Sequence, residues 1–146
     1  MKATEGKTGR IFILRLDDGD IVPGCIEQFA RENNISAAQV IIVGGIGSGE
    51  VVVGPRETDK MPPMPMMVPV DGAHEIAAVG LLAPDEKGKP VLHIHGAMGR
   101  SGQTLTGCLR PGVKTWLVAE VIIFELLDVK VVRRYDEKSG FTLLQI

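Results

Sequence analysis

Aromatic residues and cysteines are scarce in this sequence. Aromatic side chains make up 4% of its 146 residues, and its two cysteines are Cys25 and Cys108. Two cysteines cannot build the disulfide framework of a small secreted protein. With few aromatic rings, the core must be filled by valine, isoleucine and leucine, which favour β-strands. The hydrophobic fraction is nevertheless 45%, which suggests that a second copy of the chain covers some apolar surface.

Long apolar runs and blocks of like charge are also missing. No stretch reaches the roughly 20 apolar residues of a transmembrane helix, and the first ten residues, MKATEGKTGR, lack the apolar segment of a signal peptide. We therefore expect a cytoplasmic protein with no membrane partner. The net charge of −2 disfavours DNA binding, which requires a basic surface.

Glycine and proline divide the chain into short elements. A buried strand is expected at 9–16, a helix within 20–34 with Asp20 as N-cap and Asn33–Asn34 at its exit, and two glycine-bent strands within 39–54. The proline-rich and methionine-rich segment 60–70 is expected to be an extended loop. Further strands are expected at 75–83, 90–98, 103–109, 115–127, 129–135 and 141–146.

This order of elements predicts an α+β fold in which a largely antiparallel sheet of about eight strands carries one or two helices. We expect residues 1–8 to be an N-terminal tail and residues 9–146 to form a single domain.

Two of the three histidines lie one residue apart, and a cysteine follows them after a glycine-rich turn. In a strand, His93 and His95 share one face. A tight turn around 99–102 would place Cys108 opposite His93, so all three side chains would converge, provided that the register is right. Imidazole and thiolate suit a divalent transition metal, zinc above all, and three ligands leave a fourth position open.

The alternative is that the histidines form an exposed polar strand face and that Cys108 is a small core residue. Glu75 and Glu120, in neighbouring apolar strands, are candidates for carboxylates that orient a ligating imidazole. His74 is a candidate fourth ligand. No residue pattern identifies a catalytic group or an organic cofactor.

Three other features have simpler structural explanations. The run GGIGSG at 44–49 does not continue into a helix, so a bent strand or turn is favoured over a phosphate loop. Cys25 is expected to be a buried structural thiol. Arg133 and Arg134 point to opposite faces of a strand, and a surface or intersubunit ion pair with Asp128, Glu125 or Asp136 is favoured over an anion contact.

Over residues 9–146 the chain resembles the PPC (plants and prokaryotes conserved) domain family, also described as predicted DNA-binding proteins. The resemblance rests on four blocks in the family's order: ILRLDDGDIVPGCIEQFARENNISAAQVIIVGGIGS, HEIAAVGLL, PVLHIHGAMG with TGCL, and AEVIIFELLDVKVVRRYDEKSGFTLL. It implies an antiparallel sheet domain that assembles as a homotrimer. It also implies a metal site built from His93, His95 and a later position where the family usually has histidine and this chain has Cys108.

The family's plant members join this domain to AT-hooks, which contact DNA. This chain lacks the Arg-Gly-Arg-Pro core of such a hook, so DNA is not the expected partner. The sequence therefore favours a metal-binding homotrimer with an open His/His/Cys site for a small molecule, acting as a sensor or as a metal-dependent enzyme. The alternatives are a transcription-associated DNA-binding regulator and a protein-interaction scaffold.

Overall fold

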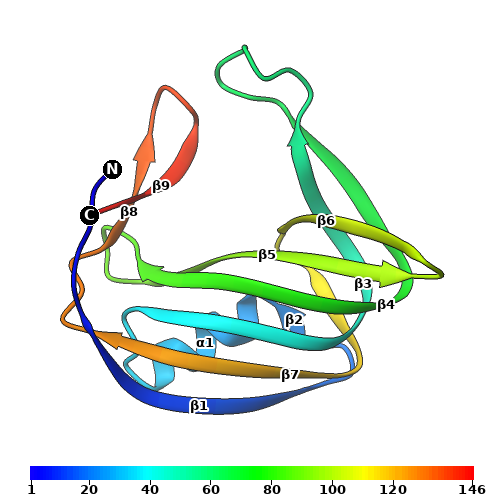
Figure 1. Cartoon of the computed structure of the whole chain (residues 1–146), viewed down its shortest axis with the longest axis horizontal. Helices are drawn as coiled ribbons and strands as arrows, with labels where there is room; N and C mark the ends of the chain where they lie inside the picture. The colour runs from blue at the N-terminus through cyan, green and yellow to red at the C-terminus, as the bar shows by residue number, and fades with distance from the viewer.

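A computed structural model describes residues 1–146 and confirms a mostly antiparallel β-fold with a single helix (Figure 1). There are nine strands, close to the expected number: β1 (Lys7–Asp17), β2 (Ile21–Val22), β3 (Ala38–Pro55), β4 (Pro65–Pro84), β5 (Pro90–Arg100), β6 (Gln103–Leu109), β7 (Val113–Leu127), β8 (Val132–Asp136) and β9 (Phe141–Gln145). The helix α1 is Gly24–Glu32. At nine residues it is far shorter than a bilayer crossing requires, and none of the chain's helical structure meets that requirement.

Seven strands form one sheet that curls back on itself. Its order is β1-β7-β3-β4-β5-β6, with β2 beside β7 and a further pairing between β3 and β6. The segment 39–54, expected as two strands, lies within the single bent strand β3. Its bend passes through Gly44 and Gly49, whose φ angles are +136° and +132°. A Cβ on Gly44 would lie 2.5 Å from Ala119 Cα, so β3 can approach β7 closely here only with glycine.

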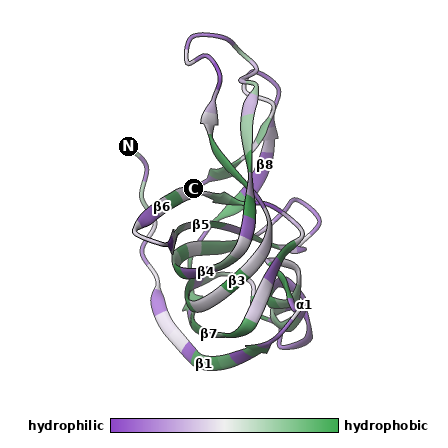
Figure 2. Cartoon of the chain, turned by 90° about the vertical axis from the view of Figure 1, so that its right-hand side faces the viewer, coloured by the Kyte–Doolittle hydropathy of each residue, from purple (hydrophilic) through white to green (hydrophobic).

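Alternation along the strands divides this sheet into two faces. One face packs into a core cluster of 22 buried residues and is covered by α1, which buries Ile26 and Ala30. Phe29 of the helix meets Phe12 of β1 edge to face, with ring centroids 5.3 Å apart. Figure 2 shows the helix on one side of the stacked strands. The opposite side, which we call the open face, carries a row across six strands: Ile13, Ile122, Ile41, Val79, His95 and Cys108.

The helix begins later than the sequence predicts, and its expected N-cap is wrong. The Asp20 carboxylate accepts a hydrogen bond from the Asp17 amide (2.8 Å), so it closes the turn before β2. Pro23 precedes the helix and supplies no side-chain cap. The exit is as expected: Asn33 is the C-cap and Asn34 has a left-handed φ of 56°.

The segment 60–70 is only partly a loop, which corrects the sequence prediction. Residues from Pro65 onward belong to β4 and pair with β3, for example Glu50 with Pro69. β5 pairs with β4 only from Glu75, so the first part of β4 is an edge, where proline loses no ladder hydrogen bond. This part of β3 and β4 forms an arm that projects from the sheet (Figure 1).

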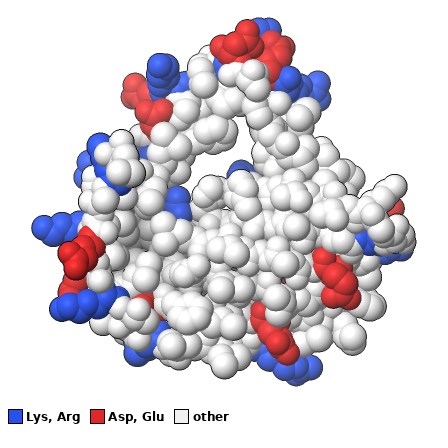
Figure 3. Space-filling model, viewed as in Figure 1, with Lys and Arg blue, Asp and Glu red and all other residues white.

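β8 and β9 form a separate hairpin above one end of the sheet. A bridge between Asp85 and Arg133 joins it to the end of β4. A Cβ on Gly140 would lie 3.3 Å from Pro62, so the turn of this hairpin reaches the loop of the arm. Figure 3 shows the opening that the two enclose.

A buried carboxylate ties the outer strand to the helix end. Glu125 has a side chain 8% exposed and accepts hydrogen bonds from Arg10 Nε (2.8 Å) and Nη2 (2.7 Å), while Nη2 also donates to Asn33 O (3.0 Å). A Cβ on Gly9 would come within 2.7 Å of this carboxylate. The side-chain hydrogen bond from Arg10 is the main cause that lowers the pKa of Glu125 to about 2.

We expect Glu125→Gln to lower the free energy of unfolding at pH 7 by about 2 kcal/mol, because hydrogen bonds to a charged group are lost. The wild type should lose this contribution as the pH falls from about 4.5 towards 2, since the folded-state pKa lies below the ordinary value. The variant should lack that pH dependence. Urea unfolding at several pH values measures both effects, and Asp17→Asn, in an exposed pair with Arg15, should change stability by less than about 0.5 kcal/mol. Equal effects of the two substitutions would contradict the stabilising role of the Arg10–Glu125 pair.

Candidate metal centre

The centre is built on the hairpin of β5 and β6. Its turn has two residues, Ser101 and Gly102, with φ angles of 51° and 78°, between the paired residues Arg100 and Gln103. Positive φ at both positions is the pattern of the tight turn that suits the right-handed twist of a hairpin. This turn fixes which residues of β6 face the histidines.

The register differs from the sequence prediction by two residues. Cys108 pairs with His95 rather than with His93, because the turn lies one residue further along the chain than expected. A shift of two leaves every side chain on its original face, whereas a shift of one would have reversed Cys108. His93, His95 and Cys108 therefore share the open face of the sheet.

The three side chains offer ligand atoms that all lie within 4.8 Å of one another. The Nε2 atoms of His93 and His95 are 3.1 Å apart. Ligands of a tetrahedral zinc ion lie roughly 3.4–3.8 Å apart, given its bond lengths, which is close to the spacing within this group. The Cys108 Sγ has only a weak contact of 3.9 Å to Leu109 O. The donor atoms and their spacing thus fit a zinc-like ion.

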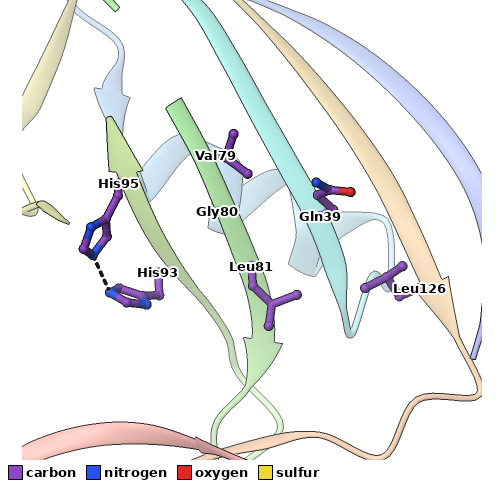
Figure 4. Close-up of a pocket in the computed structure, with 7 residues that line it drawn as sticks. All are labelled: Gln39, Val79, Gly80, Leu81, His93, His95 and Leu126. Atoms are coloured by element: carbon purple, nitrogen blue, oxygen red, sulfur yellow. Dashed lines mark hydrogen bonds between the residues drawn. The ribbon is translucent and has the colours of Figure 1, made fainter. Parts of the chain in front are cut away.

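An open pocket of about 470 Å³ lies beside the histidines (Figure 4). It is lined by His93, His95, Gln39, Val79, Gly80, Leu81 and Leu126. The wall facing the imidazoles is mainly apolar, with the Gln39 amide as its polar group. A small molecule bound here would meet both the imidazoles and an apolar surface.

The expected carboxylates do not reach the histidines. Glu75 pairs with Gly99, four residues along β5 from His95, about 13 Å away at the rise of a strand. Glu120 lies on β7, three strands from β5 and thus about 14 Å away. Neither position suits a partner that orients the ligands.

An arginine occupies the place beside the histidines instead. Arg133 is 5% exposed, and its Nη2 and Nε donate to Leu81 O (2.8 Å) and Val91 O (3.3 Å). Leu81 pairs with His93. Ala83, two residues on and on the same face, is fully buried although that face is otherwise open. Arg133 therefore lies over the open face next to His93.

Within one chain, the partners predicted for the two arginines are wrong. Arg134 pairs with Glu86 (3.3 Å) at the surface, and Arg133 pairs with no carboxylate. The carboxylates expected for them bind elsewhere: Asp128 to Lys7, Glu125 to Arg10 and Asp136 to Ser139. The role of Arg133 depends on how β8 packs on β4, which no local pattern in the sequence indicates.

Positive charge and burial act together on His93. Desolvation is the main cause that lowers the pKa of His93, followed by the charges of His95, Arg133 and Arg110. A lowered pKa favours the neutral imidazole, which is the form that binds a metal.

Three other candidates lie outside this centre. His74 Nδ1 is 2.8 Å from Gly72 O, and His74 is not part of the group of ligand atoms. Burial raises the pKa of the Cys25 thiol, which makes it less reactive. The glycines at 44–49 lie within β3 rather than in a phosphate loop.

Comparison with known proteins agrees with this architecture. Residues 3–127 match the profile of the Plants and Prokaryotes Conserved (PCC) domain. A curated relative, bifunctional protein GlmU of Synechococcus, is 28% identical over 140 residues, which are 94% of this chain and 20% of that protein. The chain thus spans about a fifth of the length of this relative.

Two solved structures superpose over the whole of both chains. One is a metal-containing protein from Archaeoglobus fulgidus, with a TM-score of 0.85, 27% identity and coverage of 100% of each chain. The other is a plant- and prokaryote-conserved protein from Pyrococcus horikoshii, with a TM-score of 0.81, 21% identity and the same coverage. The second likeness concerns the fold alone.

In the metal-free protein, we expect His93 to protonate with a midpoint below the ordinary value of 6.5. Arg133→Gln should raise that midpoint, because it removes a neighbouring positive charge, whereas Arg134→Gln should leave it unchanged. A pH titration followed by NMR of the imidazole carbons measures the His93 midpoint in the wild type and in both variants. A midpoint at or above 6.5 in the wild type would contradict the electrostatic account.

Proposed function

The chain belongs to the Plants and Prokaryotes Conserved domain family, and we propose that it is a metal-binding member whose centre is formed by His93, His95 and Cys108. The observation that carries the proposal is the convergence of two imidazoles and one thiol within 4.8 Å on one face of the β5–β6 hairpin. The likeness to a metal-containing protein of the same fold, at 27% identity over the full length, supports it.

Zinc is the metal we propose, because two imidazoles and a thiolate are among its preferred ligands. A bound zinc ion would supply Lewis acidity and an exchangeable fourth position. The chain's own residues orient the two imidazoles through the β5 register and place the apolar pocket beside them. A small molecule would bind at this fourth position, in a sensor or in a metal-dependent enzyme.

We further propose that the protein is a homotrimer whose subunits meet through the open face. Large apolar side chains on this face are exposed, including Ile13 (80%), Ile11 (59%) and Val43 (47%). Figure 3, seen from the side opposite α1, shows charged groups mainly at the rim and an almost uncharged middle.

The second patch of such a contact is proposed to be the arm. In a ring, each contact joins two different patches. Met61 and Met64 near the tip of the arm are 57% and 63% exposed, and flexible methionines adapt well to irregular apolar surfaces. The sequence places the domain at residues 9–146 with 1–8 as its tail. Because Lys7 and Thr8 already pair with β7, we propose that the domain begins at Lys7.

Elemental analysis of the purified protein tests the metal centre. We expect about one zinc ion per chain, as in a mononuclear site, and little or none in His93→Ala and Cys108→Ala. His74→Ala removes the third histidine, which lies outside the centre, and should retain the metal. If the wild type cannot be loaded with zinc, or if all three variants keep it, the metal-binding proposal is wrong.

Light scattering tests the assembly. The wild type should have three times the chain mass of 15.7 kDa, and Ile13→Asp or Met64→Asp should reduce the mass by burying a charge in the contact. Leu143→Asp is the control, because Leu143 is 44% exposed, lies on the separate β8–β9 hairpin and is opposite Arg134. A monomeric wild type would refute the trimer, and a trimer that survives both substitutions would refute this interface.

A further inference from the structure

We propose that the ligand at the open position of the metal centre is a small organic carboxylate with a short apolar body, held by the Arg133 guanidinium. The inference rests on the metal-binding function proposed above. It identifies the chemical class of ligand that the centre accepts, and it follows from the charge and shape of the surroundings rather than from the three metal ligands.

Arg133 is a buried cation without a counter-ion. Its side chain binds only the carbonyls of Leu81 and Val91, and no carboxylate lies within ion-pair distance. The Nη1 atom of Arg133 has no hydrogen-bond acceptor within the chain. This atom reaches solvent, because Thr115 Oγ1 is the only side-chain nitrogen or oxygen that is both fully enclosed and without a partner. A buried guanidinium is expensive unless an anion neutralises it. Arg133 therefore retains N–H groups and charge for a ligand.

The net charge of the metal-loaded centre also favours an anionic ligand. A divalent ion with two neutral imidazoles and one thiolate keeps one positive charge. Arg133 adds another beside His93, and Arg110 is close enough to affect the same imidazole. Glu75 and Glu120, the carboxylates that could have balanced this charge, lie too far away. An anionic ligand would supply the missing negative charge.

The shape of the pocket selects among anions. The guanidinium is a planar fork that matches a carboxylate through two parallel hydrogen bonds. The part of the wall nearest the histidines is formed by Val79 and Leu81, which pair with His95 and His93. This apolar surface suits a short alkyl group and disfavours a free inorganic anion with polar atoms on every side. Arg133, which lies next to His93 and outside the lining of this pocket, would thus hold the carboxylate beside the metal ligands. The alkyl body would pack on Val79 and Leu81.

Cobalt-loaded protein allows a direct test, because the visible absorption of Co(II) changes when its fourth ligand changes. Butyrate is the probe, with acetate, inorganic phosphate and uncharged butyramide as comparisons. We expect spectral titration by butyrate at lower concentration than by acetate or phosphate, and no titration by butyramide. This ranking uses the wild-type protein alone and so does not depend on the folding of any variant.

Substitutions then assign the role of Arg133. Arg133→Gln should weaken butyrate about 10- to 100-fold, the range for a lost hydrogen bond to a charged group, and Arg133→Lys should recover part of that loss. Arg134→Gln removes the same charge from the adjacent, exposed position and should leave the butyrate affinity unchanged.

The outcomes separate the two proposals. If neither cobalt nor zinc binds to the wild type, both the metal centre and the carboxylate site are refuted. If cobalt binds but butyrate leaves its spectrum unchanged, or if butyramide competes equally well, the metal centre stands and the carboxylate inference is overturned. A stronger effect of phosphate than of butyrate would overturn the organic carboxylate in favour of an inorganic anion. Equal affinity in wild type and Arg133→Gln would remove Arg133 from the site.

Discussion

The two-residue turn at Ser101–Gly102 sets the geometry on which the candidate centre depends. Side chains alternate across a sheet with a period of two, so the register of β6 against β5 decides whether Cys108 faces the histidines or the core. The turn keeps Gly107 and Leu109 buried and leaves Cys108 beside His95. The alternation along β5 that exposes His93 and His95 also buries Leu92, Ile94 and Met98 on the other face, so the same strand supplies both core residues and candidate ligands.

That coupling explains why the centre lies on the open face. α1 covers one side of the sheet only, and on the other side the β8–β9 hairpin covers only the end near Ala83, so most side chains there are exposed. The result is an apolar surface of isoleucine and valine on this face, and Val79 at its edge lies opposite His95. A subunit contact on this surface would lie next to the pocket, so assembly and ligand access would be linked in the proposed trimer.

Arg133 changes the charge around the histidines, and it comes from the β8–β9 hairpin rather than from the main sheet. The β8–β9 hairpin covers Ala83 and brings a guanidinium beside His93, where the sequence suggested carboxylates from neighbouring strands. A carboxylate would have made the surroundings of the histidines negative, whereas Arg133 makes them positive. The positive surroundings narrow the proposed class of ligand from small molecules in general to anions.

The sequence alone determined most of the strands, the faces of His93 and His95, and the presence of Cys108 on the same face, because these follow from local alternation and a glycine-rich turn. Only the tertiary structure decided that His95 rather than His93 is opposite Cys108, that Pro65–Val70 is an edge strand, and that Arg133 rather than Glu75 or Glu120 lies beside the imidazoles. These depend on where a turn begins, on which strand edge stays unpaired, and on how a distant hairpin packs. Such contacts join residues far apart in the chain, and periodicity within a segment carries no information about them.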